Sequence, residues 1–254
     1  MVHSRSNHRR ILVPSQPTYL AWPGYFARLI GADELALMDD VQFVRQGWQH
    51  RNHIWDQSVG RRMLTIPVMK KGRYDQRIDE VEIATPGWES KHLSQIRQAY
   101  PKLRARGPVG ELVEEYYRRE YRWLRDANEQ FIDMTLDFLQ IPIKVTRSSA
   151  LGVTGKKTER LLDMCARTNC NVMRLGPGAL NYLDLDMIAD AGVELEILRT
   201  KESSPEQKSD VDLSRLSILD TMLWHGDQSR RSLEENHWME SVVRTPLVEA
   251  SSRP

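Results

Sequence analysis

Two short apolar runs near the start of the chain end abruptly in polar residues. Residues 11–14 (ILVP) run into a break at Gln16, and residues 35–38 (LALM) lead directly into Asp39 and Asp40. Runs of this length predict buried strands. In an open parallel sheet, ligands bind at the carboxyl ends of strands, where the strand order reverses. The pattern therefore predicts a binding site at the ends of these two strands.

The second half of the chain alternates between strand and helix patterns. Apolar runs at residues 143–146, 172–175 and 193–198 predict strands, and three-to-four spacing over residues 156–169 and 180–191 predicts helices between them. Such alternation gives right-handed parallel crossovers. We therefore predict an α/β fold with an open, largely parallel sheet flanked by helices.

A helical insertion over about residues 88–139 separates the two halves. It begins with a predicted helix over residues 88–100, and a break near residues 125–128 divides the remainder into two more helices. We expect the insertion to cap the site. Before it, residues 63–68 and 81–84 predict two strands that pair with each other.

The two ends of the chain lack a core-forming pattern. Residues 1–10 are basic and polar and predict a flexible tail, whereas residues 213–224 predict a last helix. The charged, aperiodic end predicts no regular element, and its last ten residues are expected to be disordered. We therefore predict one α/β domain over residues 11–225 and a partly disordered extension over 226–254.

Composition narrows the class of protein. A hydrophobic fraction of 40% in 254 residues supports a substantial core, and a net charge of +1 argues against a nucleic-acid binder. The sequence shows neither an 18-residue apolar run nor a leader pattern, so we expect no membrane span and no signal peptide. The cysteines, Cys165 and Cys170, make no disulfide framework, which favours a cytoplasmic location.

Asp39 and Asp40 are the first candidates for catalysis. A carboxylate at the end of a strand can act as a general base, hold a substrate amine or bind a metal ion. The alternative is a solvated turn or a helix cap. The polar residues that follow favour the functional interpretation.

The loop after the first strand offers groups that could orient a substrate. The Gln16 amide can read a hydroxyl or an amide, and Tyr19, Trp22 and Tyr25 can wall a pocket for a sugar or base ring. The alternatives are that Gln16 satisfies loop backbone groups and that the aromatic rings are core.

A polar cluster follows the acidic pair. Arg45 and Arg51 can clamp a phosphate or carboxylate, while Gln42 and Asn52 can orient the acceptor. A solvated loop is the alternative. His50 and His53 lack a third partner at a diagnostic spacing, and we predict no metal site.

Two later loops suit an anion. Ser148 and Ser149 precede a glycine-containing turn with Lys156 at a helix start, and Gly176 allows close backbone approach to a ligand. The turn does not match a Walker A sequence, and capping or a plain turn is the alternative. The sequence also lacks G-x-S-x-G, H-E-x-x-H and G-x-G-x-x-G motifs, which leaves a Ser–His hydrolase unsupported.

Several blocks resemble the signature blocks of the WbqC-like family in order and spacing, across roughly residues 11–225. They read QPTYLAWPGYF, DDVQF, HRNHIW, LTIPV, WESKHL, SSALG with GKKTERLLDMC, LGPGALNYLD and LSILDTMLWHG. One departure is Ala21, where family members usually have Pro. The resemblance implies a bacterial protein similar to those encoded among O-antigen and other surface-sugar genes.

Two classes of function remain. The first is a biosynthetic enzyme of surface-polysaccharide or specialised metabolism that transfers an acyl or aminoacyl group to an amine on a sugar or related small metabolite. A variant is a nucleotide-sugar or nucleotidyl transferase that uses Asp39 and Asp40 through a divalent cation. The second class is a non-catalytic ligand-binding partner of a biosynthetic enzyme. A nucleotide such as ATP is one candidate cofactor, and the oligomeric state is open.

Overall fold

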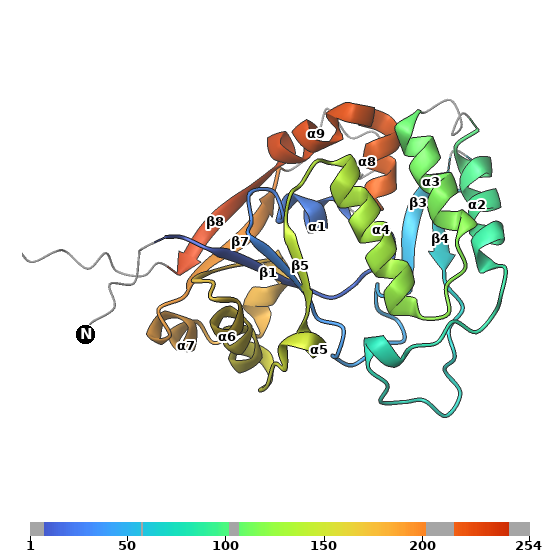
Figure 1. Cartoon of the computed structure of the whole chain (residues 1–254). Coiled ribbons are helices and arrows are strands. Elements are labelled where there is room, and N and C mark those ends of the chain that lie inside the picture. The colour runs from blue at the N-terminus through green and yellow to red at the C-terminus, as the bar shows by residue number, and fades with distance from the viewer. Residues whose placement is uncertain (1–7, 57, 102–106, 202–215, 244–254) are drawn as a thin grey trace, which may run out of the picture.

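The computed structural model describes residues 8–56, 58–101, 107–201 and 216–243. A six-stranded sheet forms the centre of the molecule (Figure 1), and its strands lie in the order β5-β2-β1-β6-β7-β8. Their bounds are β5 Lys144–Arg147, β2 Glu34–Leu37, β1 Ile11–Ser15, β6 Val172–Leu175, β7 Glu194–Thr200 and β8 His237–Val243. All neighbouring pairs are parallel except β7 with β8, which confirms the open, largely parallel sheet.

Helices cover both faces of the sheet (Figure 1). Within β1, Ile11 and Val13 face one core, while Leu12 faces the other, as strand alternation requires. The Leu12 face packs against α6 (Lys157–Thr168) and α7 (Leu185–Asp190). The opposite face packs against other helices, namely α1 (Pro23–Ala27), α4 (Leu124–Phe138), α8 (Ile218–His225) and α9 (Ser229–Asn236).

The helical insertion is confirmed. It contains α2 (Trp88–Ala99), α3 (Pro108–Arg118) and α4, all of which contribute to the larger core. The predicted break near residues 125–128 was wrong, because the chain leaves the helix after Arg118. It re-enters a helix at Leu124, the first residue of α4, whose N–H donates to Val81 O at 2.9 Å.

A second, two-stranded sheet lies beside the insertion. Strands β3 (Arg51–Asp56) and β4 (Gly60–Thr65) pair in antiparallel fashion. The polar composition of β3 concealed it, although Asn52, Ile54 and Asp56 alternate inward. Residues 81–84 form single bridges instead of the predicted strand, including one between Val68 and Ile83.

Regular structure continues beyond Gly226, contrary to the aperiodic pattern. Helix α9 and strand β8 follow, and β8 pairs along β7 at the sheet edge. The predicted helix over residues 180–191 is shorter, since a 3-10 helix, η3 (Pro177–Asn181), precedes α7. The last ten residues lie outside the described part of the chain. No helix in that described part is long and apolar enough to cross a membrane.

Candidate functional site

Strand β1 lies at the point where the strand order reverses. Its neighbours are β2 on one side and β6 on the other, and all three run parallel. The loops that leave their carboxyl ends carry Gln16, Asp39 and Gly176 to one edge of the sheet, and β5 brings Ser148 to the same edge. This is the position at which open α/β sheets bind ligands.

The acidic pair meets the two serines at this edge. Asp39 is fully buried and accepts hydrogen bonds from the Ser149 N–H at 3.0 Å and the Ser149 hydroxyl at 2.7 Å. Asp40 accepts from the Ser148 hydroxyl and from Arg160 Nη2 at 2.5 Å. These bonds tie the end of β2 to the start of α5 (Ser148–Leu151).

Electrostatics at Asp40 favour a charged carboxylate. Burial by itself raises the pKa of Asp40, but hydrogen bonds from Arg160 and Ser148 outweigh it, and the pKa lies below its ordinary value. Both oxygens of Asp39 and the Oδ1 of Asp40 thus already accept protein donors. The arrangement suits a link between strands better than a base that meets a substrate.

A cavity of about 670 Å³ opens at the end of β1. We call it the aromatic lobe, and its lining includes Gln16, Trp22, Trp48, Gln49 and His53. Gln49 Nε2 donates to Gln16 Oε1 at 2.8 Å, whereas the buried Gln49 Oε1 has no partner among the described residues. Amide groups beneath indole rings are suited to a polar ring such as a sugar.

A second cavity of about 310 Å³ adjoins the first between the ends of β1 and β6. We call it the basic lobe. Its lining includes Ser15, Tyr25, Arg28, Gly176 and Tyr182. Gln16, Thr18 and Trp22 line both cavities, so Gln16 stands at their junction.

His53 offers a titratable group to the aromatic lobe. Its ring centroid lies 5.8 Å from that of Trp48. Burial, together with the positive charges of Arg61 and Arg51, lowers the pKa of His53 below its ordinary value. The imidazole is therefore neutral at pH 7 and can accept a proton.

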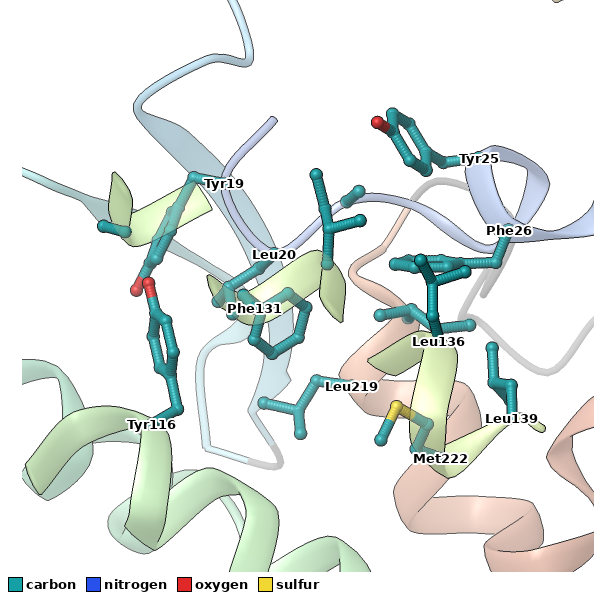
Figure 2. Packing of buried hydrophobic residues seen from close by; sticks show 14 of the residues in the cluster. Tyr19, Leu20, Tyr25, Phe26, Tyr116, Phe131, Leu136, Leu139, Leu219 and Met222 are labelled. Atoms are coloured by element: carbon teal, nitrogen blue, oxygen red, sulfur yellow. The ribbon is translucent and has the colours of Figure 1, made fainter. Parts of the chain in front are cut away.

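Tyr19 belongs to the core and does not line either cavity. Its ring is fully buried (Figure 2), and its hydroxyl contacts the Tyr117 hydroxyl at 2.5 Å and His92 Nδ1 at 2.7 Å. Asn52 lines the aromatic lobe and also supports the loop that carries Tyr19, because its Nδ2 donates to Leu20 O at 2.7 Å. Trp22 and Tyr25 line the cavities as well.

The other predicted anion-binding groups lie outside the two lobes. Gln42 is exposed and bridges to Arg77, and Arg45 donates to Lys70 O at 3.0 Å. Arg51 contacts Gln46 O and lies 5.9 Å from the Trp48 ring, behind the wall of the aromatic lobe. Lys156 is exposed at the start of α6, and Ser148 and Ser149 are bonded to the acidic pair.

The sequence analysis missed Arg28 as a site residue. Arg28 follows α1 within the apolar segment PGYFARLIG, and its side chain is buried. An arginine between apolar neighbours was the available signal, because charged residues are seldom fully buried unless paired. His53, Trp48 and Gln49 were missed as lining residues because their places depend on the fold of the β2–β3 loop.

The fold and cavity define an α/β protein with a ligand-sized space at the switch point of its sheet. The chain belongs to the WbqC-like protein family, whose pattern it matches over residues 16–232. It is 28% identical to an uncharacterised protein of Mycobacterium tuberculosis, Rv1507c, over 170 residues, which are 66% of this chain and 73% of that protein. No solved structure gives a significant match.

Proposed function

We propose that the protein is a biosynthetic transferase that moves an acyl or aminoacyl group to an amine on a sugar or related small metabolite. The observation that supports it is the pair of adjoining lobes that share Gln16, Thr18 and Trp22. Two substrates held in adjoining lobes would react where the lobes meet, because binding brings the reacting atoms into contact. The family resemblance suggests surface-polysaccharide or specialised biosynthesis in the cytoplasm as the setting.

In this mechanism the acceptor amine lies in the aromatic lobe. Its nitrogen attacks the acyl carbonyl carbon of the donor, a C–N bond forms, and the bond from that carbon to the leaving group breaks. His53 accepts the proton that the nitrogen loses, for which a neutral imidazole is required. Gln16, held by Gln49, donates a hydrogen bond to the carbonyl oxygen as negative charge develops on it.

In this proposal Asp39 and Asp40 are not the general base that the sequence suggested. No carboxylate belongs to the lining of either lobe over the described residues, so we assign the base to His53. Asp39 and Asp40 become positioning residues that hold α5 against the end of β2. A transferase that used this pair through a divalent cation would first have to displace the serine and arginine donors.

A change at Trp48 tests the aromatic lobe. Trp48 is 51% exposed and lines the lobe, while Trp224 is 63% exposed on α8 and lines neither cavity. We expect Trp48→Ala to weaken the binding of amino-sugar acceptors by on the order of tenfold, through lost ring contact. Trp224→Ala is the matched control. Calorimetric titration with glucosamine and nucleotide-linked amino sugars provides the measurement, and equal affinities in the two variants would contradict the assignment.

A non-catalytic binding protein is the second candidate. The observation that favours it is the lack of an acidic group in the described lining of both lobes. Such a protein would bind the acceptor with the same sensitivity to Trp48 but would form no product. Mass spectrometry of the acceptor after incubation with acyl and aminoacyl donors, with and without ATP and Mg²⁺, separates the two candidates.

A further inference from the structure

Arg28 is a buried cation that lacks a counter-ion in the described structure. Its side chain is 7% exposed, its Nε donates to Gly24 O at 3.3 Å, and its guanidinium lies 5.5 Å from the Tyr25 ring centroid. No carboxylate of the described residues forms an ion pair with it. A guanidinium remains charged in proteins, and a buried charge is costly unless it is paired.

Two hydroxyl groups beside Arg28 are also incompletely bonded. Ser15 and Tyr25 are buried and their hydroxyls interact with each other, but neither the Ser15 Oγ nor the Tyr25 OH has a hydrogen bond of full geometry with a described residue. Figure 2 shows the Tyr25 hydroxyl pointing away from the packed apolar side chains. All three side chains line the basic lobe. Buried polar groups that converge on one cavity suit a polar ligand, which would satisfy them.

Two glycines form part of the wall of the basic lobe. A side-chain carbon added at Gly176 or at Gly178 would meet no atom within 4 Å, so neither glycine is required by local packing. Both border the lobe between β6 and α7. Bare backbone at this point leaves space for a ligand to enter.

We propose that Arg28, Tyr25 and Ser15 form a seat for the carboxylate group of a substrate, the rest of which extends past Trp22 toward the aromatic lobe. One guanidinium balances one negative charge, and its planar fork matches a carboxylate with two parallel hydrogen bonds. No second cation lines the lobe in the described chain, and the neighbouring Arg174 is paired with Glu196 at 2.6 Å. A dianionic phosphate would therefore be only partly neutralised.

The inference deepens the proposed function, since it makes one substrate of the transferase a carboxylic acid or a carboxylate-bearing derivative. Burial lowers the pKa of Arg28, and the groups that oppose this effect are the phenols of Tyr25 and Tyr182 rather than a carboxylate. The carboxylate would supply the missing counter-charge on binding. Ligand binding is then expected to stabilise the folded chain through mass action.

Thermal unfolding of the whole chain tests the seat with small probes. Acetate and lactate should raise the melting temperature of the wild-type protein in a saturable manner, whereas acetamide and chloride at matched ionic strength should not. Inorganic phosphate should have a smaller effect than acetate. Calorimetric titration with lactate should show that Arg28→Met weakens binding roughly 10- to 100-fold, because charge-assisted bonds are lost. Tyr25→Phe should weaken it less.

The variants also report on folding without any ligand. Because Arg28→Met removes a buried charge that has no partner, we expect its melting temperature to equal or exceed that of the wild type. A marked fall, or a response to acetate that Arg28→Met leaves unchanged, would overturn the seat. A larger response to phosphate would overturn the choice of carboxylate. Acceptor binding that depends on Trp48 would survive either result, so failure of the seat is distinguishable from failure of the transferase proposal.

Discussion

At the scale of single residues, the acidic pair shows how the same chemistry takes a different role once it is buried. Asp39 and Asp40 stand where a base was expected, just after the end of β2. Their oxygens are bonded to Ser148, Ser149 and Arg160. A carboxylate that accepts several fixed donors orders the backbone around it and has little capacity left for a substrate.

Asp39→Asn tests this structural role. We expect the free energy of unfolding to fall by about 1–3 kcal/mol, because charge-assisted bonds to the Ser149 N–H and hydroxyl are weakened. Urea denaturation gives the measurement, with Asp137→Asn on the exposed side of α4 as the control. If the variant keeps its stability but loses turnover, Asp39 rather than His53 would be the general base.

The proposed mechanism makes activity depend on pH in a defined direction. With His53 as the base, the neutral imidazole is the active form, so kcat/KM should fall as pH decreases through the pKa of His53. Because burial lowers that pKa, the midpoint of the fall should lie below the ordinary value of 6.5. His53→Ala should remove this acidic limb and lower kcat more than it changes acceptor affinity. If the fall in kcat/KM at acidic pH persists in the variant, a group other than His53 causes it.

At the scale of elements, Asp220 joins α8 to the β3–β4 hairpin. Its Oδ1 accepts from the Trp55 N–H at 3.0 Å and from the Tyr100 hydroxyl, and it is fully buried. Burial raises the pKa of Asp220 from an ordinary value of 3.8 to about 6. The free energy of unfolding therefore depends on whether Asp220 is protonated.

The pH dependence of stability follows from this raised pKa. Between the two pKa values the folded chain binds the proton more tightly than the unfolded chain, so this contribution to stability decreases as pH rises from about 4 to about 6. The full change is about 3 kcal/mol. Asp220→Asn should remove this pH dependence. The free energy of unfolding of the wild type, measured by urea denaturation, should therefore fall relative to that of the variant as pH rises across this range. A constant difference would contradict the raised pKa.

At the scale of the whole molecule, β8 completes the sheet from a part of the chain that lacked a strand signal. It covers the edge of β7 over Leu195–Thr200, and its Met239 packs against the larger core. The edge strand of a sheet otherwise presents unpaired N–H and C=O groups to other chains. The closing strand therefore protects the sheet that carries the site.

Removal of β8 should destabilise and aggregate the protein. A chain that ends at Asn236 exposes the β7 edge and loses the Met239 contact, whereas a chain that ends at Val243 retains both and is the matched reference. We expect a lower melting temperature and higher-mass species for the shorter chain, measured by calorimetry and by light scattering after size exclusion. Identical behaviour of the two would show that β8 is dispensable.

The sequence alone determined the framework of this protein. Apolar runs at residues 11–14, 172–175 and 193–198 become β1, β6 and β7, and helical spacing over residues 156–169 becomes α6. Burial on both faces of a parallel sheet requires continuous apolar runs, which are local and visible in sequence. The carboxyl edge of the sheet, and so the region of the site, followed from the same pattern.

The tertiary structure decided which side chains line the two lobes. Asp39 is hydrogen-bonded to Ser149, which lies 110 positions later in the chain. Arg28 lines the same cavity as Gly176. Strand β8 exists because β7 offers it an edge. Access, pairing of charges and edge pairing all depend on residues brought together by folding over long separations, and no local pattern encodes them.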